Sequence, residues 1–242
     1  MEYESKNDEG AQKMSLKILK NAFCILLAVL LSLLILLTAT EMVVFDMNYF
    51  SSQYDKYDIP VKLGIEKDEL MKSTEKLLDY LKDKRDDLNF KALIRGQEQE
   101  FFSPRDKLHM IDVKNLFIIG RNTRNGIFAF LLCLTGIMVY KKRKIKSGNL
   151  FLLSSILGIL PIIMLVILMN IDFYKYFTIF HEIFFSNDLW LLDPKVDRLV
   201  NIFPESFFYD TALRIIIYYL TAQAVLFILG LTINIRKKMK RQ

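Results

Sequence analysis

Four long stretches of the sequence contain no aspartate, glutamate, lysine or arginine, and they limit the fold more than any other feature does. They cover residues 21–40, 125–140, 147–171 and 215–235. A helix rises ~1.5 Å per residue and needs about 20 residues to cross a hydrocarbon core of ~30 Å, so three stretches are long enough by themselves. The second is shorter, and Arg124 and Lys141 can extend it by reaching toward the membrane interfaces. The sequence therefore predicts an all-α integral membrane protein with four transmembrane helices.

The composition supports this prediction. Hydrophobic residues make up 52% of the 242 residues and aromatic residues 13%, which is more apolar than a soluble domain of this length. Such a composition excludes an ordinary soluble enzyme and a disordered tail protein. Cys24 and Cys133 both fall inside predicted spans, where thiols usually pack as small apolar groups, so the chain is also no secreted disulfide scaffold.

The charges predict how the chain crosses the membrane. Two basic clusters, at residues 141–146 and 236–241, directly follow predicted spans and contain no acidic residue. The positive-inside rule places such clusters, and with them both chain termini, in the cytoplasm. We therefore expect one membrane domain over residues 1–242, with cytoplasmic segments at 1–20, 141–146 and 236–242. Because basic clusters beside spans are a common topology signal, we expect no nucleic-acid partner.

The same orientation predicts a cap outside the cytoplasm, formed by loops 41–124 and 172–214. Leucines at helical spacing within residues 67–88 predict an amphipathic cap helix. The segment Ser103-Pro104-Arg105-Asp106 has the pattern of a helix start and predicts a helix through residue 114. We expect the cap to be mostly helical.

The two histidines of the chain are the most informative polar residues, because one lies in each extracytoplasmic loop. No predicted span contains an acidic or basic side chain, which argues against an ion-coupled transporter and places the chemistry outside the hydrocarbon. His109 shares a helix face with Asp112 and Val113. His181 lies in the aromatic segment 173–190, where helical spacing would place it on one face with Phe184, Phe185 and Asp188.

Each histidine alone is consistent with a hydrogen-bonded side chain at the membrane interface, but two on one side favour a shared site. A zinc site of His109, His181 and one carboxylate from Asp112, Glu182 or Asp188 is an alternative, although H-E-x-x-H is absent. No G-x-S-x-G motif and no extracytoplasmic cysteine is present to supply a nucleophile. The mechanism that remains is acid and base catalysis by histidine, acting on a substrate that carries its own nucleophile.

Two blocks of sequence around the histidines carry a family resemblance. They are H-M-x-D-V-K within residues 102–117, and F-H-x-x-F-F-x-N-D-x-W-x-L-D-P over residues 180–194, continuing through Asp197 to 202–204. Both resemble the bacterial lipoprotein intramolecular transacylase family, Lit, whose four-span layout is similar over nearly the whole chain.

This resemblance implies an acyltransferase of the cell membrane of Gram-positive bacteria. Its substrate would be a lipoprotein with a diacylglyceryl group on its N-terminal cysteine, presented among membrane lipids. One acyl chain would move from the glyceryl sn-2 oxygen to the α-amino group of that cysteine, giving a lyso-form lipoprotein. The paired histidines of the family match His109 and His181, and neither a cofactor nor a metal is implied.

The residues agree with such a reaction. An α-amino group has a pKa of about 7.7 to 8 and must lose a proton before it attacks an ester, and a histidine can accept that proton. We expect Asp112 or Asp188 to orient an imidazole, with Glu182 as a further supporting candidate. The expected oxyanion-stabilising groups are Lys114, Asn187 and Arg198. Two alternatives are a metal-dependent membrane lipid hydrolase or phosphatase, and a non-catalytic envelope protein that binds lipoproteins.

Overall fold

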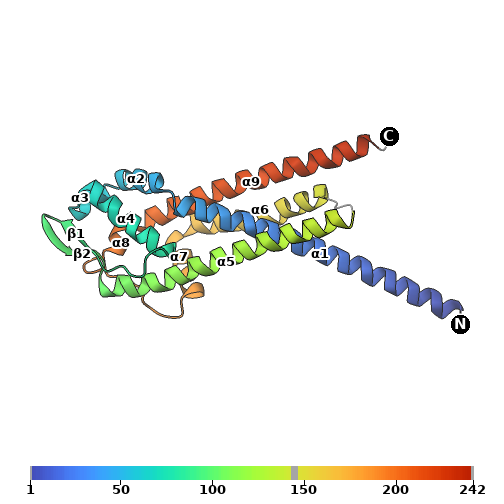
Figure 1. Ribbon diagram of the computed structural model, residues 1–242, viewed down its shortest axis with the longest axis horizontal. Helices are drawn as coiled ribbons and strands as arrows, with labels where there is room; N and C mark the ends of the chain where they lie inside the picture. The colour runs from blue at the N-terminus through green and yellow to red at the C-terminus, as the bar shows by residue number, and fades with distance from the viewer. Residues whose placement is uncertain (1, 143–146, 241–242) are drawn as a thin grey trace. The chain divides into compact units, whose positions relative to one another are not determined.

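The computed structural model describes residues 2–142 and 147–240 (Figure 1). Within these residues, four helices are long and apolar enough to cross a membrane. They are α1 (Glu2–Val44), α5 (Pro104–Tyr140), α6 (Ser147–Ile171) and α9 (Glu205–Met239). The prediction of an all-α membrane protein with four spans is confirmed. Residues 143–146 of the first basic cluster and 241–242 at the end of the chain lie outside the described part.

The chain divides into two compact units, and each is described by itself. We name them by their content: the span unit comprises Met1–Leu36, Asn125–Met164 and Tyr218–Gln242, and the cap unit comprises Leu37–Arg124 and Leu165–Ile217. The cap unit holds the shorter elements α2 (Met47–Lys56), α3 (Ile59–Leu63), α4 (Lys67–Leu81), β1 (Lys91–Ile94), β2 (Gln97–Glu100), α7 (Phe173–Phe184) and α8 (Leu199–Ile202).

A cluster of uncharged polar side chains lies inside the span unit. Ser32 of α1 is hydrogen-bonded to the Tyr219 hydroxyl of α9, and Gln223 Nε2 donates to Ser32 Oγ at 3.1 Å. A Cβ atom added at Gly158 of α6 would lie only 2.3 Å from Ser32 Oγ and from the Tyr219 hydroxyl. Glycine at this position therefore lets α6 approach α1 and α9 closely, as small residues do between membrane helices.

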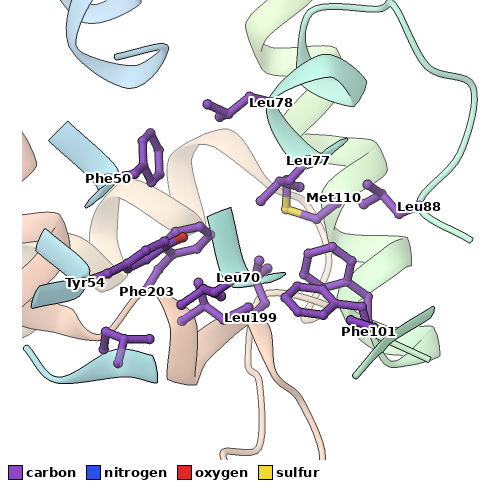
Figure 2. Packing of buried hydrophobic residues seen from close by; sticks show 14 of the residues in the cluster. Phe50, Tyr54, Leu70, Leu77, Leu78, Leu88, Phe101, Met110, Leu199 and Phe203 are labelled. Carbon is purple, nitrogen blue, oxygen red and sulfur yellow. The ribbon is translucent and has the colours of Figure 1, made fainter. Parts of the chain in front are cut away.

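The cap unit has its own hydrophobic core, built largely from aromatic and leucine side chains (Figure 2). Helix α4 contributes the buried residues Leu70, Leu77, Leu78 and Leu81, which confirms the amphipathic helix expected here. The expected end at residue 88 is wrong, because Lys82 caps the helix and Asp83 takes a left-handed conformation with φ of 62°. Leu88 is nevertheless buried in the same core.

A short antiparallel hairpin in the cap unit was not expected from the sequence. Strands β1 and β2 pair across a two-residue turn in which Arg95 and Gly96 have φ of 51° and 78°. Positive φ at both turn residues matches the twist of a tight hairpin, and glycine reaches it without steric cost. The hairpin leads into Phe101 and Phe102, which are both buried.

Candidate active site

The first turn of α5 is fixed by a reciprocal cap. The backbone N–H of Asp106 donates to Ser103 Oγ at 3.0 Å, and the backbone N–H of Ser103 donates to Asp106 Oδ2 at the same distance. This capping box satisfies two helix-end donors and confirms the predicted helix start. It places His109 on the second turn of α5.

The same carboxylate ties α5 to the segment after α7. Asp106 is fully buried and also accepts the backbone N–H groups of Arg198 at 3.0 Å and Leu199 at 3.3 Å. Ser103 Oγ donates to Asp197 Oδ1 at 2.6 Å. Burial raises the pKa of Asp106, while the backbone donors act in the opposite direction. These bonds hold the chain that follows His181 against the helix that carries His109.

The tautomer of His181 follows from its hydrogen bond within α7. His181 Nδ1 lies 2.7 Å from the carbonyl oxygen of Phe177, and a carbonyl can only accept, so Nδ1 carries the proton. In the neutral imidazole, Nε2 then holds the lone pair. Burial lowers the pKa of His181, and the bond to Phe177 acts in the opposite direction.

The two histidines lie beside each other, as the shared-site hypothesis expected. Their ring centroids are 6.1 Å apart. Both residues are buried, with exposed fractions of 6% for His109 and 9% for His181. Phe185 contacts both rings, with centroids 5.3 Å from His109 and 5.6 Å from His181. Trp190 packs on His181 with a centroid distance of 4.9 Å.

His109 differs from His181 in its hydrogen bonding. Within the described residues, nothing bonds to its buried Nδ1 atom. Burial, followed by the neighbouring His181, lowers the pKa of His109 to about 4. His109 lies on the charged first part of α5, outside the apolar stretch that begins at residue 125. Both imidazoles are therefore neutral near pH 7, and His109 is the weaker base.

An apolar cavity of about 180 Å³ adjoins the histidines. Its walls come from the end of α1, from α2, α4, α5, α7 and α8, and from the start of α9. They include Phe50, Leu78, Val113, Phe185, Phe203 and Phe207 beside the two imidazoles. A cavity so lined offers water few polar partners. The site thus combines a pair of buried bases with space for hydrocarbon.

Two of the supporting candidates lie near each other but outside this cavity. Asn187 Nδ2 donates to Asp112 Oδ2 at 2.9 Å, and both residues line a separate, more polar pocket that shares Phe185. Asp188 is not on the His181 face of a helix, because α7 ends at Phe184, so that part of the spacing prediction is wrong. Its exposed side chain pairs with Arg105 at 3.6 Å.

The remaining supporting candidates bind elsewhere in the cap unit. Lys114 Nζ pairs with Asp83 at 2.7 Å and donates to the Arg85 carbonyl at 3.1 Å. Arg198 donates to the carbonyl of Glu100 at 2.7 Å. Glu182 is on the exposed side of α7. None of the three lines the cavity beside the histidines.

Sequence reasoning missed Arg105, which is the cation closest in sequence to His109 on its helix face. The two residues are four positions apart, so they are neighbours on α5. Arg105 contributes to lowering the pKa of His109, and its buried Nε has no hydrogen-bond partner among the described residues. The i, i+4 spacing was the signal that could have identified it.

The structure does not favour the zinc alternative. Among the residues that the structure describes, no group of three or more histidine, cysteine, aspartate or glutamate side chains is placed to hold a metal ion. Asp112 is the carboxylate whose charge raises the pKa of His109, in opposition to burial. Its side chain accepts a hydrogen bond from Asn187.

Known proteins give a consistent picture. Residues 25–208 match the family described as lipoprotein intramolecular transacylase Lit. The solved structure of the membrane integral lipoprotein intramolecular transacylase Lit from Bacillus cereus is similar, with a TM-score of 0.76 and 25% identity over 91% of this chain and 98% of that one. A variant of it with a histidine replaced by arginine has a TM-score of 0.74 and 24% identity, over 96% and 99% of the two chains.

A relative from Aquifex aeolicus, described as an uncharacterized protein, is 26% identical over 187 residues, which are 76% of this chain and 83% of the relative. The family match extends over most of the chain and includes both histidines. The protein therefore belongs to the Lit family of lipoprotein intramolecular transacylases and is an integral membrane acyltransferase.

Proposed function

We propose that this enzyme moves an acyl chain within a bacterial lipoprotein, from the sn-2 oxygen of the S-diacylglyceryl group to the α-amino group of the N-terminal cysteine. The product is a lyso-form lipoprotein. The observation that carries this proposal is the pairing of His109 and His181, 6.1 Å apart at the wall of an apolar cavity. Both lie in the cap unit. The basic clusters at 141–146 and 236–241 support an extracytoplasmic position for this site, because such clusters are typical of cytoplasmic segments.

His181 acts as the base in this proposal. Its Nε2 is the unprotonated nitrogen because Nδ1 donates to Phe177, and that carbonyl also stabilises the imidazolium that forms. The α-amino nitrogen attacks the sn-2 ester carbonyl and gives up a proton to Nε2. When the bond between the carbonyl carbon and the glyceryl oxygen breaks, the same proton passes to that oxygen. An ester and an amine thus become an amide and an alcohol with no other reactant.

His109 acts as the neutral hydrogen-bond donor of the pair. With a pKa of about 4 it is a poor proton acceptor near neutral pH, but a neutral imidazole still carries one N–H group. Directed at the carbonyl oxygen, that N–H stabilises the charge that develops in the tetrahedral intermediate. Arg105, one turn earlier on α5, adds positive charge near the same place.

The surroundings of the pair favour aminolysis over hydrolysis. Amine and ester belong to one molecule, and holding them in contact can supply ~7–11 kcal/mol in favourable cases. Phe185 and Trp190 cover the imidazoles and keep water away from the ester. A substrate that brings its own nucleophile explains why the site needs no serine or cysteine.

The direct test uses purified enzyme in lipid vesicles with a synthetic lipopeptide whose N-terminal cysteine carries a diacylglyceryl group. Tandem mass spectrometry locates each acyl chain. The wild type should move one chain from glycerol to the amine at unchanged total mass. His181→Ala and His109→Ala should each lower the rate at least ~100-fold, the usual minimum for loss of acid and base catalysis.

The matched control is Glu182→Gln, which changes the exposed neighbour of His181 on the same helix and should keep the wild-type rate. Loss of an acyl mass from the peptide would indicate a hydrolase and contradict the proposal. Wild-type rates in both histidine variants would contradict the assignment of the pair.

A further inference from the structure

We infer that the cavity beside the histidines holds the first part of the acyl chain that is transferred, and that the space between its walls sets how much of that chain the enzyme can take up. This inference rests on the proposed function. It follows from the lining of the cavity, which includes both His109 and His181. An ester carbonyl placed between the two imidazoles therefore has its alkyl chain directed into the cavity. The chain at sn-1, whose ester does not react, has no such requirement.

A row of aromatic rings connects His181 with Phe50, and all of these rings except Phe177 line the cavity. Ring centroids follow one another from His181 to Phe177 at 4.4 Å, to Phe208 at 4.8 Å, to Phe207 at 6.0 Å and to Phe50 at 5.5 Å. Three other rings thus separate Phe50 of α2 from His181. Leu77 and Leu78 of α4 line the cavity too, and Figure 2 shows all three side chains within the core of the cap unit.

The volume sets how much of a chain fits. An apolar cavity of about 150 Å³ holds a benzene molecule, so a cavity of about 180 Å³ takes on the order of six to eight carbon atoms. An acyl chain of a membrane lipoprotein is longer than that. The carbon atoms nearest the carbonyl occupy the cavity, which is partly open, and the rest of the chain extends out of it.

The cavity selects by space and not by hydrophobicity. The acyl chain comes from lipid, which is as apolar as the leucine and phenylalanine walls, so transfer between the two changes the free energy little. Atoms forced against a wall, in contrast, push side chains out of their preferred rotamers and make binding less favourable. A larger side chain in the cavity wall should therefore exclude long chains and leave short ones unaffected.

The test is a competition between two synthetic lipopeptides in the same vesicles. They share the peptide and the sn-1 chain and carry either a butyryl or a palmitoyl chain at sn-2. Mass spectrometry gives the ratio of the two N-acylated products for the wild type and for Leu78→Phe. The variant should shift the ratio toward butyryl by about tenfold or more, the factor that ~1.4 kcal/mol produces. Leu77→Phe, on the same wall, should shift it in the same direction.

The control is Leu63→Phe, the same substitution at a residue that packs on the same core without lining the cavity. It should leave the product ratio unchanged. Because both substrates meet the same enzyme, a loss of folded protein cancels from the ratio. A second pair of lipopeptides, with the length varied at sn-1, should give wild-type ratios in every variant.

The outcomes separate the two proposals. If the wild type forms no N-acylated product from any lipopeptide, the proposed function fails. If the wild type transfers the chain but Leu78→Phe and Leu77→Phe keep its product ratio, the cavity does not hold the transferred chain. A shift that follows the sn-1 chain would place the wrong chain in the cavity and overturn the inference.

Discussion

Acidification should destabilise the cap unit through one buried side chain, His109. Its pKa is about 4 in the folded protein, whereas an exposed histidine has a pKa of about 6.5. Between these values the unfolded chain binds a proton that the folded protein does not. Stability is therefore complete above pH 6.5 and is lost progressively as the pH falls toward 4.

The size of the effect follows from the two pKa values. At pH 5 the unfolded state gains ~2 kcal/mol from protonation at this one position, and at pH 4 the gain reaches ~3 kcal/mol. For a chain of this length, ~1 kcal/mol corresponds to a shift of about 2–4 °C in the melting temperature. The contribution of His109 at pH 5 is then about 4–8 °C.

His109→Gln isolates this contribution, because glutamine is polar but does not titrate. The melting temperature of both proteins is measured in detergent at pH 7 and pH 5 by the fluorescence of Trp190, the single tryptophan, which packs on His181 in the cap unit. Carboxylates titrate equally in both and cancel from the comparison. The wild type should lose about 4–8 °C more than the variant. Equal losses would refute the reasoning that burial keeps His109 neutral.

Three further predictions concern the rate and the packing. The value of kcat/KM should rise with pH up to about 8, as the α-amino group loses its proton, with no break near 6.5, because burial lowers the pKa of both histidines. Gly158→Ala should lower the melting temperature by several degrees, since its Cβ would meet Ser32 and Tyr219, whereas Gly136→Ala has open space and should match or exceed the wild type. Asp106→Asn should lower the free energy of unfolding by ~1–3 kcal/mol, because it leaves buried N–H groups poorly paired, and should slow acyl transfer. The control Asp188→Asn, at an exposed position, should change the free energy of unfolding by less than ~0.5 kcal/mol in the same melting experiments.

The membrane architecture could be predicted because it depends on local properties of the sequence. A charge-free stretch of sufficient length must form a helix in lipid, where every backbone group needs an internal partner. The start of α5 was predictable for a similar reason, since Ser103, Pro104 and Asp106 satisfy their own helix end. The expectation that both histidines belong to extracytoplasmic loops rests on counting spans, and it stays a prediction.

The details of the site depend on contacts between distant residues, which no local pattern reveals. Helical spacing predicted that Asp188 shares a face with His181, which requires α7 to continue to residue 188. The helix ends at Phe184, so the two residues do not share a helix face. Lys114 and Arg198 carry the charge that an oxyanion needs, but Asp83 and the Glu100 carbonyl bind them instead. The hairpin at residues 91–100 was missed because its strands are four residues long and β2 reads Gln-Glu-Gln-Glu, without an apolar alternation.

The hydrogen bond from His181 Nδ1 to the Phe177 carbonyl has a consequence for how this enzyme family tolerates change. The acceptor is a main-chain atom one helical turn earlier, so every amino acid at position 177 supplies it, provided that α7 keeps its helical geometry. The backbone geometry of the helix, and not a partner side chain, thus determines which imidazole nitrogen is the base. Sequences can diverge widely around such a histidine while its proton stays on the same nitrogen.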